Sequence, residues 1–443
     1  MTPIFKKGTK GSPGNYRPVS LTSVPCKILE TCLKERIMDH LTVNNLIKES
    51  QHGFLPGKSC ATNLVKFMDK VTKAVDEGKS VDIFYLDFAK AFDKVPRQRL
   101  MKKLRAKGLD EKAAVWIENW LTGRTQKVKI KGEMSTSCNV DSGVPQGTVL
   151  GPPLFTVYID DLEDEVIERL LDVLVMKFAD DTKGAKVIEG EEDRQKLQQA
   201  LDCLCDWADR WGMAFNFEKC KIMHIGRHNP QFEYYMRGEK VSTTEEERDI
   251  GVAITKNLKP AAQCSKAAGR AMAVLHQMRR NFHYRDRFTF VRLYKQYVRP
   301  HLEFASQAWS PWLAGDREVL EKVQKKAVGM VSGLKGKSYE ERCAELGLET
   351  LETRRIKQDM SLVHKLISNG GGEELFTTAG GHDGVRTRRA AAANGLSAPF
   401  ARTDIRKYSF AVRTVEHWNS LPEGARTANS QQSFKELLKN IKM

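Results

Sequence analysis

The sequence contains no long apolar run. None of its hydrophobic segments approaches the roughly 20 residues that a membrane-spanning helix requires. The first residues, MTPIFKKG, carry no apolar secretion signal. We therefore expect an intracellular protein, in the nucleus, the cytoplasm or both, with no membrane as a partner.

Clustered cysteines and internal repeats are also missing. The 443 residues include nine cysteines, but no C-x-x-C pair and no cysteine group close to histidines. This usage is typical of reduced thiols and argues against a structural zinc site. At roughly 100 to 200 residues per domain, the length predicts two or three domains.

Acidic residues are in the minority. Lys and Arg number 72 against 56 Asp and Glu, so the formal charge is +16 and the isoelectric point is about 9.3. Such an excess favours a polyanionic partner, because cations that neutralise phosphates release condensed counterions. An ordinary basic surface would give the same totals, so charge alone leaves both interpretations open.

The first half of the chain mixes two hydrophobic periodicities. Apolar residues recur at helical spacing in residues 28–41 and 63–75, whereas β-rich segments occupy residues 81–88, 126–131 and 173–178. This pattern predicts an α+β fold for the region up to about residue 227.

The second half is expected to be helical and basic. From residue 256 to 345 the strands stop, and aromatic residues alternate with cations in RDRFTFVRLYKQYVRPHLEF (285–304). Such a stripe is either a helix core with a charged outer face or a nucleic-acid groove. The glycine-rich break at 369–374 and the segment GVRTRRAAAANG (384–395) predict a basic linker before a final helical region.

Two adjacent acids, Asp180 and Asp181, follow an apolar run in KFADDTKG (177–184). Such a pair is often only a hairpin tip. However, Asp87 ends another β-rich segment, and strand alternation would place Ile83, Tyr85 and Asp87 on one buried face. Three carboxylates from two strands suit Mg²⁺, which takes oxygen ligands, and two such ions can support phosphoryl displacement.

A loop rich in glycine and proline lies between these acids. It spans DSGVPQGTVLG (141–151), and its backbone could approach a ligand closely at Gly147. The apolar residues that follow predict a helix. A second acidic pair, Asp160 and Asp161, falls at the end of this helix, and we expect it to be structural.

Seven ordered blocks together resemble a known family. They are NYRPVSL (15–21), SQHGF (50–54), YLDFAKAFD (85–93), SGVPQGTVLGP (142–152), KFADDTK (177–183), NFEKCKIMHIG (216–226) and RDIGV (248–252). The set is similar to that of the reverse transcriptases of non-LTR (LINE-like) retrotransposons, in particular the jockey-like branch. The tail around HWNSLP (417–422) resembles the C-terminal ends of the same proteins.

This resemblance implies a right-hand polymerase fold of fingers, palm and thumb with a helical C-terminal extension. Residues 1–255 would form fingers and palm, 256–345 the thumb, and 346–443 the extension with its basic linker. The implied activity is RNA-directed DNA synthesis with two Mg²⁺ ions, Mn²⁺ being a second candidate. An RNA template, a DNA primer or target and deoxynucleoside triphosphates would be the partners, and the oligomeric state stays open.

The resemblance also implies roles for individual residues. Asp87, Asp180 and Asp181 would hold the metal, and Lys219 would lie near the leaving phosphate. The nucleotide-binding residues would be Arg17 and Lys6 or Lys7 at the triphosphate, Phe92 under the sugar, and Gln146 and Gly147 in the pocket.

The sequence departs from the family pattern at several points. Leu55 stands where these enzymes commonly carry Arg, although Lys58 could substitute, and Phe178 stands where many carry Tyr. The resemblance further implies that the chain begins inside the fingers, without an upstream endonuclease, an RNase H region or a zinc knuckle.

Two alternatives stay open at this stage. A polymerase-derived protein that binds nucleic acid without catalysis would keep most of these blocks. A group II intron or retron-type enzyme would share the acids but matches residues 15–21 and 417–423 poorly. The cluster RTRR (386–389) could direct nuclear entry.

Overall fold

The computed structural model describes residues 1–378 and 394–441. These residues form two compact units. The first contains residues 1–59, 82–222 and 230–243, and the second contains residues 60–81, 223–229 and 244–443 apart from those outside the described ranges. The basic cluster at 386–389 and most of the expected linker lie outside the described residues. The proposed division at residues 255 and 345 stays a prediction.

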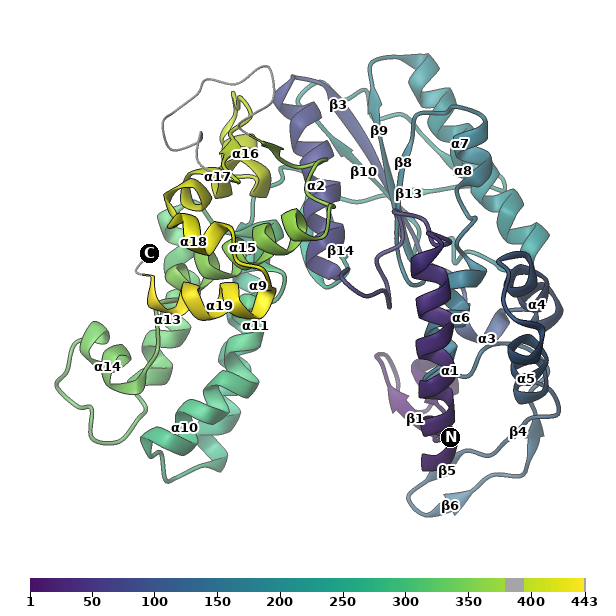
Figure 1. Ribbon diagram of the computed structural model, residues 1–443, viewed down its shortest axis with the longest axis horizontal. Helices are drawn as coiled ribbons and strands as arrows, with labels where there is room; N and C mark the ends of the chain where they lie inside the picture. Colours follow the sequence, from purple (N-terminus) through teal and green to yellow (C-terminus); the bar gives the residue numbers. More distant parts are fainter. Residues whose placement is uncertain (379–393, 442–443) are drawn as a thin grey trace. The chain divides into compact units, whose positions relative to one another are not determined.

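A five-stranded sheet contains the strands that end or begin at or next to Asp87, Asp180 and Asp181 (Figure 1). Its strands are β3 (Ser80–Leu86), β8 (Leu174–Phe178), β9 (Asp181–Ile188), β10 (Lys221–Ile225) and β13 (Ser242–Thr243). The order is β13-β10-β3-β9-β8, with β8 and β9 antiparallel and β10 and β13 parallel. The strands predicted at 81–88 and 173–178 are thus confirmed.

β3 is the central strand, and all its residues are buried. The predicted burial of Ile83 and Tyr85 is confirmed, and the opposite face of the strand is buried as well, because both sides of this central strand are covered. Consistent with this, Ile83 and Phe84 are both fully buried although they point to opposite faces.

The single strand predicted at 126–131 was wrong. Two short strands, β4 (Thr125–Gln126) and β5 (Lys129–Ile130), fall in this range, and β6 (Glu133–Met134) and β7 (Cys138–Asn139) follow it. They pair as β4 with β7 and β5 with β6. All their residues are exposed, so no buried face holds one continuous strand together.

The first unit also contains seven α-helices among its described residues. They are α1 (Val24–Val43), α3 (Ala91–Lys94), α4 (Arg97–Ala106), α5 (Glu111–Leu121), α6 (Gly151–Tyr158), α7 (Asp164–Glu168) and α8 (Glu191–Trp211). The N-terminal hairpin consists of β1 (Thr2–Phe5) and β2 (Tyr16–Val19). The short 3₁₀ helix η1 (Pro13–Asn15) lies in the connection, directly before β2. A small hairpin pairs β11 (Tyr235–Met236) with β12 (Glu239–Lys240). The helices expected at 28–41 and after the glycine loop are confirmed as α1 and α6.

The second unit is mainly helical (Figure 1). Its helices are α2 (Cys60–Asp76), α9 (Ala261–Asn281), α10 (Arg287–Leu293), the π-helical turn η2 (Tyr294–Val298), α11 (Arg299–Glu303), α12 (Ser306–Trp309), α13 (Ala314–Val328), α14 (Tyr339–Leu346), α15 (Leu351–Ser368), α16 (Asp404–Lys407), α17 (Phe410–Ser420), α18 (Glu423–Arg426) and α19 (Gln431–Asn440). The hairpin of β14 (Glu246–Asp249) with β15 (Val252–Thr255) and the antiparallel pair of β16 (Thr377–Thr378) with β17 (Leu396–Ser397) complete it. The predicted helix at 63–75 and the helical zone 256–345 are confirmed.

An aromatic cluster closes the C-terminal part of the second unit. Trp418 and Phe434 are fully buried, and the His364 ring stacks on Phe434 with 4.3 Å between ring centroids. These contacts pack α19 against α15 and α17, so α19 is part of the folded core. Among the described helices, none combines the length and apolarity needed to cross a bilayer.

Candidate active site at the β8–β9 hairpin

The acidic pair lies at the tip of a tight hairpin. Phe178 of β8 pairs with Asp181 of β9, which leaves Ala179 and Asp180 as a two-residue turn. Ala179 adopts a left-handed backbone conformation with φ of 56°, as primed hairpin turns require at their first position. The sequence left two interpretations of the acidic pair open, a hairpin tip and a metal site. The pair does lie at a hairpin tip, and this turn is what presents Asp180.

Asp87 comes directly after β3 and is only half-buried, with a side chain 38% exposed. The expectation of a buried Asp87 was therefore wrong, because the acid lies just past the strand end. Its carboxylate accepts a hydrogen bond from the Lys219 ammonium at 2.9 Å, and its backbone oxygen accepts one from the Asn216 N–H at 2.7 Å. The sequence block around Lys219 is thus held against Asp87.

Asp180 is the less accessible acid of the site. Burial raises the pKa of its carboxyl, and the neighbouring Asp87 carboxylate raises it further, whereas Arg17 and Lys6 lower it. Asp180 thus feels the charges of Asp87, Arg17 and Lys6, which lie far from it in the sequence. Asp181, in contrast, has an exposed side chain.

The described residues contain no group of three or more His, Cys, Asp or Glu side chains arranged to hold a metal ion. Asp87 and Asp180 nevertheless supply oxygen donors whose mutual repulsion a cation would relieve. Hard divalent ions take such ligands and complete their coordination with water or phosphate oxygens. The donor chemistry of the pair therefore fits the metal that the sequence predicts.

The N-terminal hairpin carries the predicted triphosphate contacts. Arg17 of β2 pairs with Ile4 of β1, and the backbone N–H of Lys6 donates to the Asn15 carbonyl at 2.8 Å. Both cations act on Asp180. Lys7 is not among the charges that act most strongly on Asp180, so Lys6 fits the role better.

Gly147 is required by a close backbone approach. Its φ is +95°, and a Cβ there would come within 2.8 Å of Val19 Cγ1 and 2.9 Å of the Ser20 carbonyl oxygen. The Gln146 carbonyl accepts a hydrogen bond from the Ser20 N–H at 2.8 Å. This loop borders a cavity of about 460 Å³ whose lining includes Gln146 and Lys90.

The same loop is bonded to the segment that carries Phe92. The N–H of Val144 donates to the Phe92 carbonyl at 2.8 Å. A Cβ on Gly143 would lie only 2.7 Å from the same carbonyl oxygen, which is too close for any other residue to fit there. The half-buried Phe92 ring stacks on Phe155 with 4.5 Å between centroids and meets Phe54 edge-on at 6.5 Å. One ring face is thus packed in the core, so a core role and a sugar-facing role both stay open.

Gln51 has a role that sequence reasoning missed. It is fully buried, and its side-chain oxygen accepts hydrogen bonds from the backbone N–H groups of Gly53 at 2.7 Å and of Ala179 at 3.0 Å. A Cβ on Gly53 would lie 2.2 Å from the Ala179 nitrogen. The block SQHGF therefore holds the hairpin tip in position. Its glutamine and glycine were the sequence features from which this role could have been predicted.

Glu30 is a second missed residue. This acid of α1 is fully buried, and its carboxylate accepts hydrogen bonds from the backbone N–H groups of Val149 at 2.6 Å and Leu150 at 3.2 Å. An acceptor at the start of α6 satisfies N–H groups that have no partner within the helix. No pattern in the sequence singled it out.

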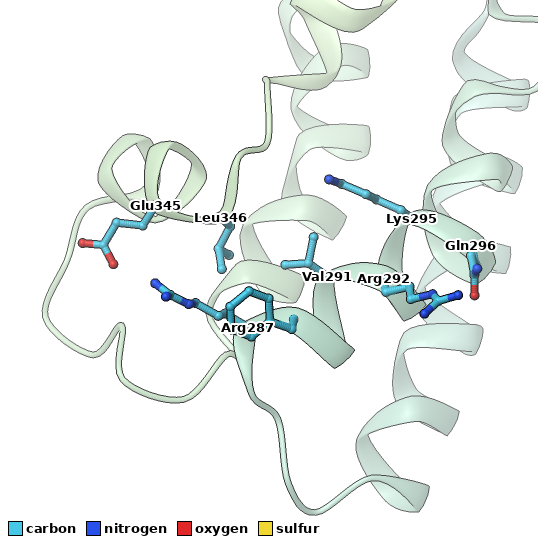
Figure 2. Close-up of a pocket in the computed structure, with 8 residues that line it drawn as sticks. Arg287, Val291, Arg292, Lys295, Gln296, Glu345 and Leu346 are labelled. Carbon is cyan, nitrogen blue, oxygen red and sulfur yellow. The ribbon is translucent and has the colours of Figure 1, made fainter.

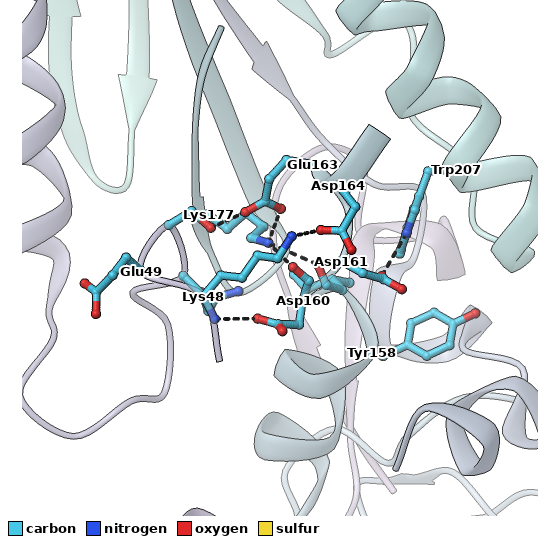
Figure 3. Close-up of polar contacts among 12 residues, drawn as sticks. Lys48, Glu49, Tyr158, Asp160, Asp161, Glu163, Asp164, Lys177 and Trp207 are labelled. Carbon is cyan, nitrogen blue, oxygen red and sulfur yellow. Dashed lines mark hydrogen bonds and ion pairs between the residues drawn. The ribbon is translucent and has the colours of Figure 1, made fainter. Parts of the chain in front are cut away.

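A buried ionic network lies beside β8 (Figure 3). Lys177, with no exposed surface, forms an ion pair with Glu163 and donates to the Asp160 carbonyl at 2.7 Å. Asp160 pairs with Lys107 at 2.6 Å, and Asp161 accepts from the Trp207 indole at 2.9 Å. The expectation that the second acidic pair is structural is consistent with these contacts.

The same network includes Lys103, whose side-chain pKa is shifted. Burial lowers the pKa of Lys103 to about 8, although its ion pair with Asp161 opposes the shift.

The structure also locates the departures from the family pattern. Leu55 packs against the hydrophobic core, and the Lys58 ammonium donates to the Glu49 carbonyl at 3.0 Å. Lys58 is thus engaged with its own loop, and its role as a substitute stays a prediction. Phe178 ends β8 beside the acids.

Comparisons with known proteins identify a matching family. The model of the family described as reverse transcriptase (RNA-dependent DNA polymerase) matches residues 4–258, more than half of the chain. The chain is 25% identical to a probable RNA-directed DNA polymerase from transposon X-element of Drosophila melanogaster, over 74% of this chain and 37% of that protein. It is 26% identical to the RNA-directed DNA polymerase from mobile element jockey of Drosophila funebris, over 72% of this chain and 36% of that protein.

These relatives are much longer than the matched region, so the chain spans little more than a third of their length. Among solved structures, an apo telomerase from Candida tropicalis is similar with a TM-score of 0.44 and 14% identity, over 93% of this chain and 61% of that chain.

Proposed function

The chain belongs to the reverse transcriptase family, and on this premise we propose that it acts as an RNA-directed DNA polymerase of a non-LTR retrotransposon of the jockey-like branch. Its substrates would be an RNA template, a DNA primer and deoxynucleoside triphosphates. The observation that carries the proposal is the tight β8–β9 turn that presents Asp180, together with the charges of Asp87, Arg17 and Lys6 that act on its carboxyl.

Members of this family generally use divalent metal ions. We assign two Mg²⁺ ions, with Mn²⁺ as a second candidate, to Asp87, Asp180 and Asp181. When bound, such ions would stabilise charge on the attacking and leaving oxygens of an in-line displacement. The primer 3′-hydroxyl would form the new bond to the α-phosphate, and pyrophosphate would leave.

The protein groups would position the nucleotide for this reaction. Arg17 offers a fork of N–H donors that matches phosphate oxygens, and Lys6 adds a point charge. Lys219 would exchange its present bond with Asp87 for a contact with the leaving pyrophosphate. Gln146 and Gly147 would border the base and sugar, because the backbone there presents no side chain at Gly147.

We further propose residues 1–255 as fingers and palm, 256–345 as thumb and 346–443 as the C-terminal extension. The helical, basic character of α9 to α13 supports a thumb that contacts the primer–template duplex.

Two observations favour a second candidate, a polymerase-derived protein that binds nucleic acid without catalysis. The described residues lack a group of three metal-ligating side chains, and Lys219 occupies a carboxylate oxygen of Asp87. Primer extension on a polyribonucleotide template with Mg²⁺ separates the two functions. Extension by the wild-type chain supports the polymerase, whereas tight template binding without extension supports the alternative.

A further inference from the structure

Two neighbouring cavities of the second unit share the side chain of Lys295. One of them, of about 470 Å³, lies among η2, α15 and α19. Six cations line it: Lys295, Arg299, Arg354, Lys357, Lys435 and Lys439. A single carboxylate, that of Glu349, joins them in the lining. Segments far apart in the sequence thus concentrate positive charge around one space.

Several of these charges lack a counter-ion. Lys357 pairs with Glu349 at 2.6 Å, and Arg354 donates to Glu303 at 2.9 Å. The ammonium groups of Lys295, Lys435 and Lys439, however, form no ion pair with any carboxylate of the described residues. Burial lowers the pKa of Lys295, and the charges of Arg299 and Arg354 lower it further. A bound anion would relieve this repulsion.

The second cavity extends the charge and adds an aromatic surface. It has a volume of about 540 Å³, and Arg287, Arg292 and Lys295 project from α10 and η2 around it (Figure 2). The Phe288 side chain, also in its lining, is 76% exposed. Cations that follow a backbone beside an exposed ring on which a base can stack are the usual elements of single-strand recognition.

We propose that these two cavities form one basic groove that binds a single strand of RNA, with phosphates at Lys295, Lys435 and Lys439 and a base on Phe288. The choice of RNA rests on the proposed function, which takes an RNA template. Part of the groove lies in the proposed thumb, but none of its residues is assigned to metal or nucleotide binding. The proposal therefore adds a single-strand contact, which includes Lys435 and Lys439 of α19, to the duplex contact proposed for the thumb.

The test is binding of a short unprimed oligoribonucleotide, measured by fluorescence anisotropy over a series of salt concentrations without nucleotides. Lys435→Ala/Lys439→Ala should weaken binding about tenfold at low salt. It should also reduce the slope of log affinity against log salt by about 1.4, since each single-strand phosphate left without its cation accounts for about 0.7. Phe288→Ala should weaken binding by a similar factor with little change in slope.

A matched control removes two lysines of the second unit that line neither cavity. Lys259→Ala/Lys322→Ala makes the same change of net charge, so equal losses in both double variants would overturn the groove. Inorganic triphosphate that competes as well as the strand would also overturn it, in favour of a small-anion pocket. Single-stranded DNA that binds equally well would overturn the choice of RNA. The polymerase proposal is tested separately by primer extension. The Asp180→Asn variant should lose extension but still bind the strand normally, so the two proposals can fail independently.

Discussion

The side-chain oxygen of Gln51 accepts a hydrogen bond from the backbone N–H of Ala179, the residue immediately before Asp180 in the hairpin turn. Gln51 is fully buried, and the same oxygen also accepts the Gly53 N–H. One side chain thus fixes the position of the turn from which an acid of the site projects.

Replacing Gln51 by Leu should lower kcat by about 10- to 100-fold, because even small displacements of reacting groups are costly. The KM for nucleotide and the affinity for primer–template should change little, whereas the apparent Mg²⁺ requirement should rise. Two buried N–H groups would also lose their acceptor, at about 1–3 kcal/mol each in the free energy of unfolding.

Gln198→Leu is the matched control, because the Gln198 oxygen accepts the Tyr235 N–H at 2.9 Å elsewhere in the first unit. It should lower stability slightly and leave kcat and the Mg²⁺ requirement unchanged. A folded Gln51→Leu protein with the kinetics of this control would contradict the positioning role.

Asp87→Asn and Asp180→Asn should each reduce primer extension by at least about 10³-fold, equivalent to about 4 kcal/mol less transition-state stabilisation. The amide keeps the shape of the side chain but removes the charge that would hold the metal. Template binding, measured separately, should stay close to wild type. Asp206→Asn, which breaks an exposed pair with Arg237, is the control and should retain activity. Near-normal turnover in either site variant would return the acidic pair to a turn-forming role.

Phe92→Val should raise the relative kcat/KM for ribonucleotides more than tenfold, or about 1.4 kcal/mol of discrimination. The ring would otherwise exclude the 2′-hydroxyl by a steric clash. Steady-state incorporation of matched ribo- and deoxynucleotides measures this ratio. Phe84→Leu, at a fully buried position of β3, should lower stability without altering the ratio. A Phe92 variant that loses both activities in proportion would show that the ring serves the core.

Lys177→Met should destabilise the protein by about 3–5 kcal/mol, because it leaves the buried Glu163 carboxylate without its partner. Urea unfolding would measure the loss. The double variant Lys177→Met/Glu163→Leu should recover much of it, since apolar replacement of a buried pair is often nearly neutral. A double variant as unstable as the sum of the single changes would show that the ion pair itself contributes little coupling.

The sequence by itself determined most of the elements that carry the candidate site, and it singled out the candidate residues that these elements present. Asp87, Asp180 and the loop around Gly147 stand out because glycines, prolines and acids at strand ends are local signals. The helices α1 and α2 and the strand β8 follow from periodicity, which depends on neighbouring residues alone.

Tertiary structure decided the rest. It alone buries β3 on both faces, leaves Asp87 half-exposed and breaks residues 126–131 into two short strands. It also assigns Gln51 and Glu30 to backbone N–H groups more than 100 positions away in the chain. Such contacts leave no periodic trace in the sequence, because burial and hydrogen-bond partners are set by segments that meet only when the chain has folded.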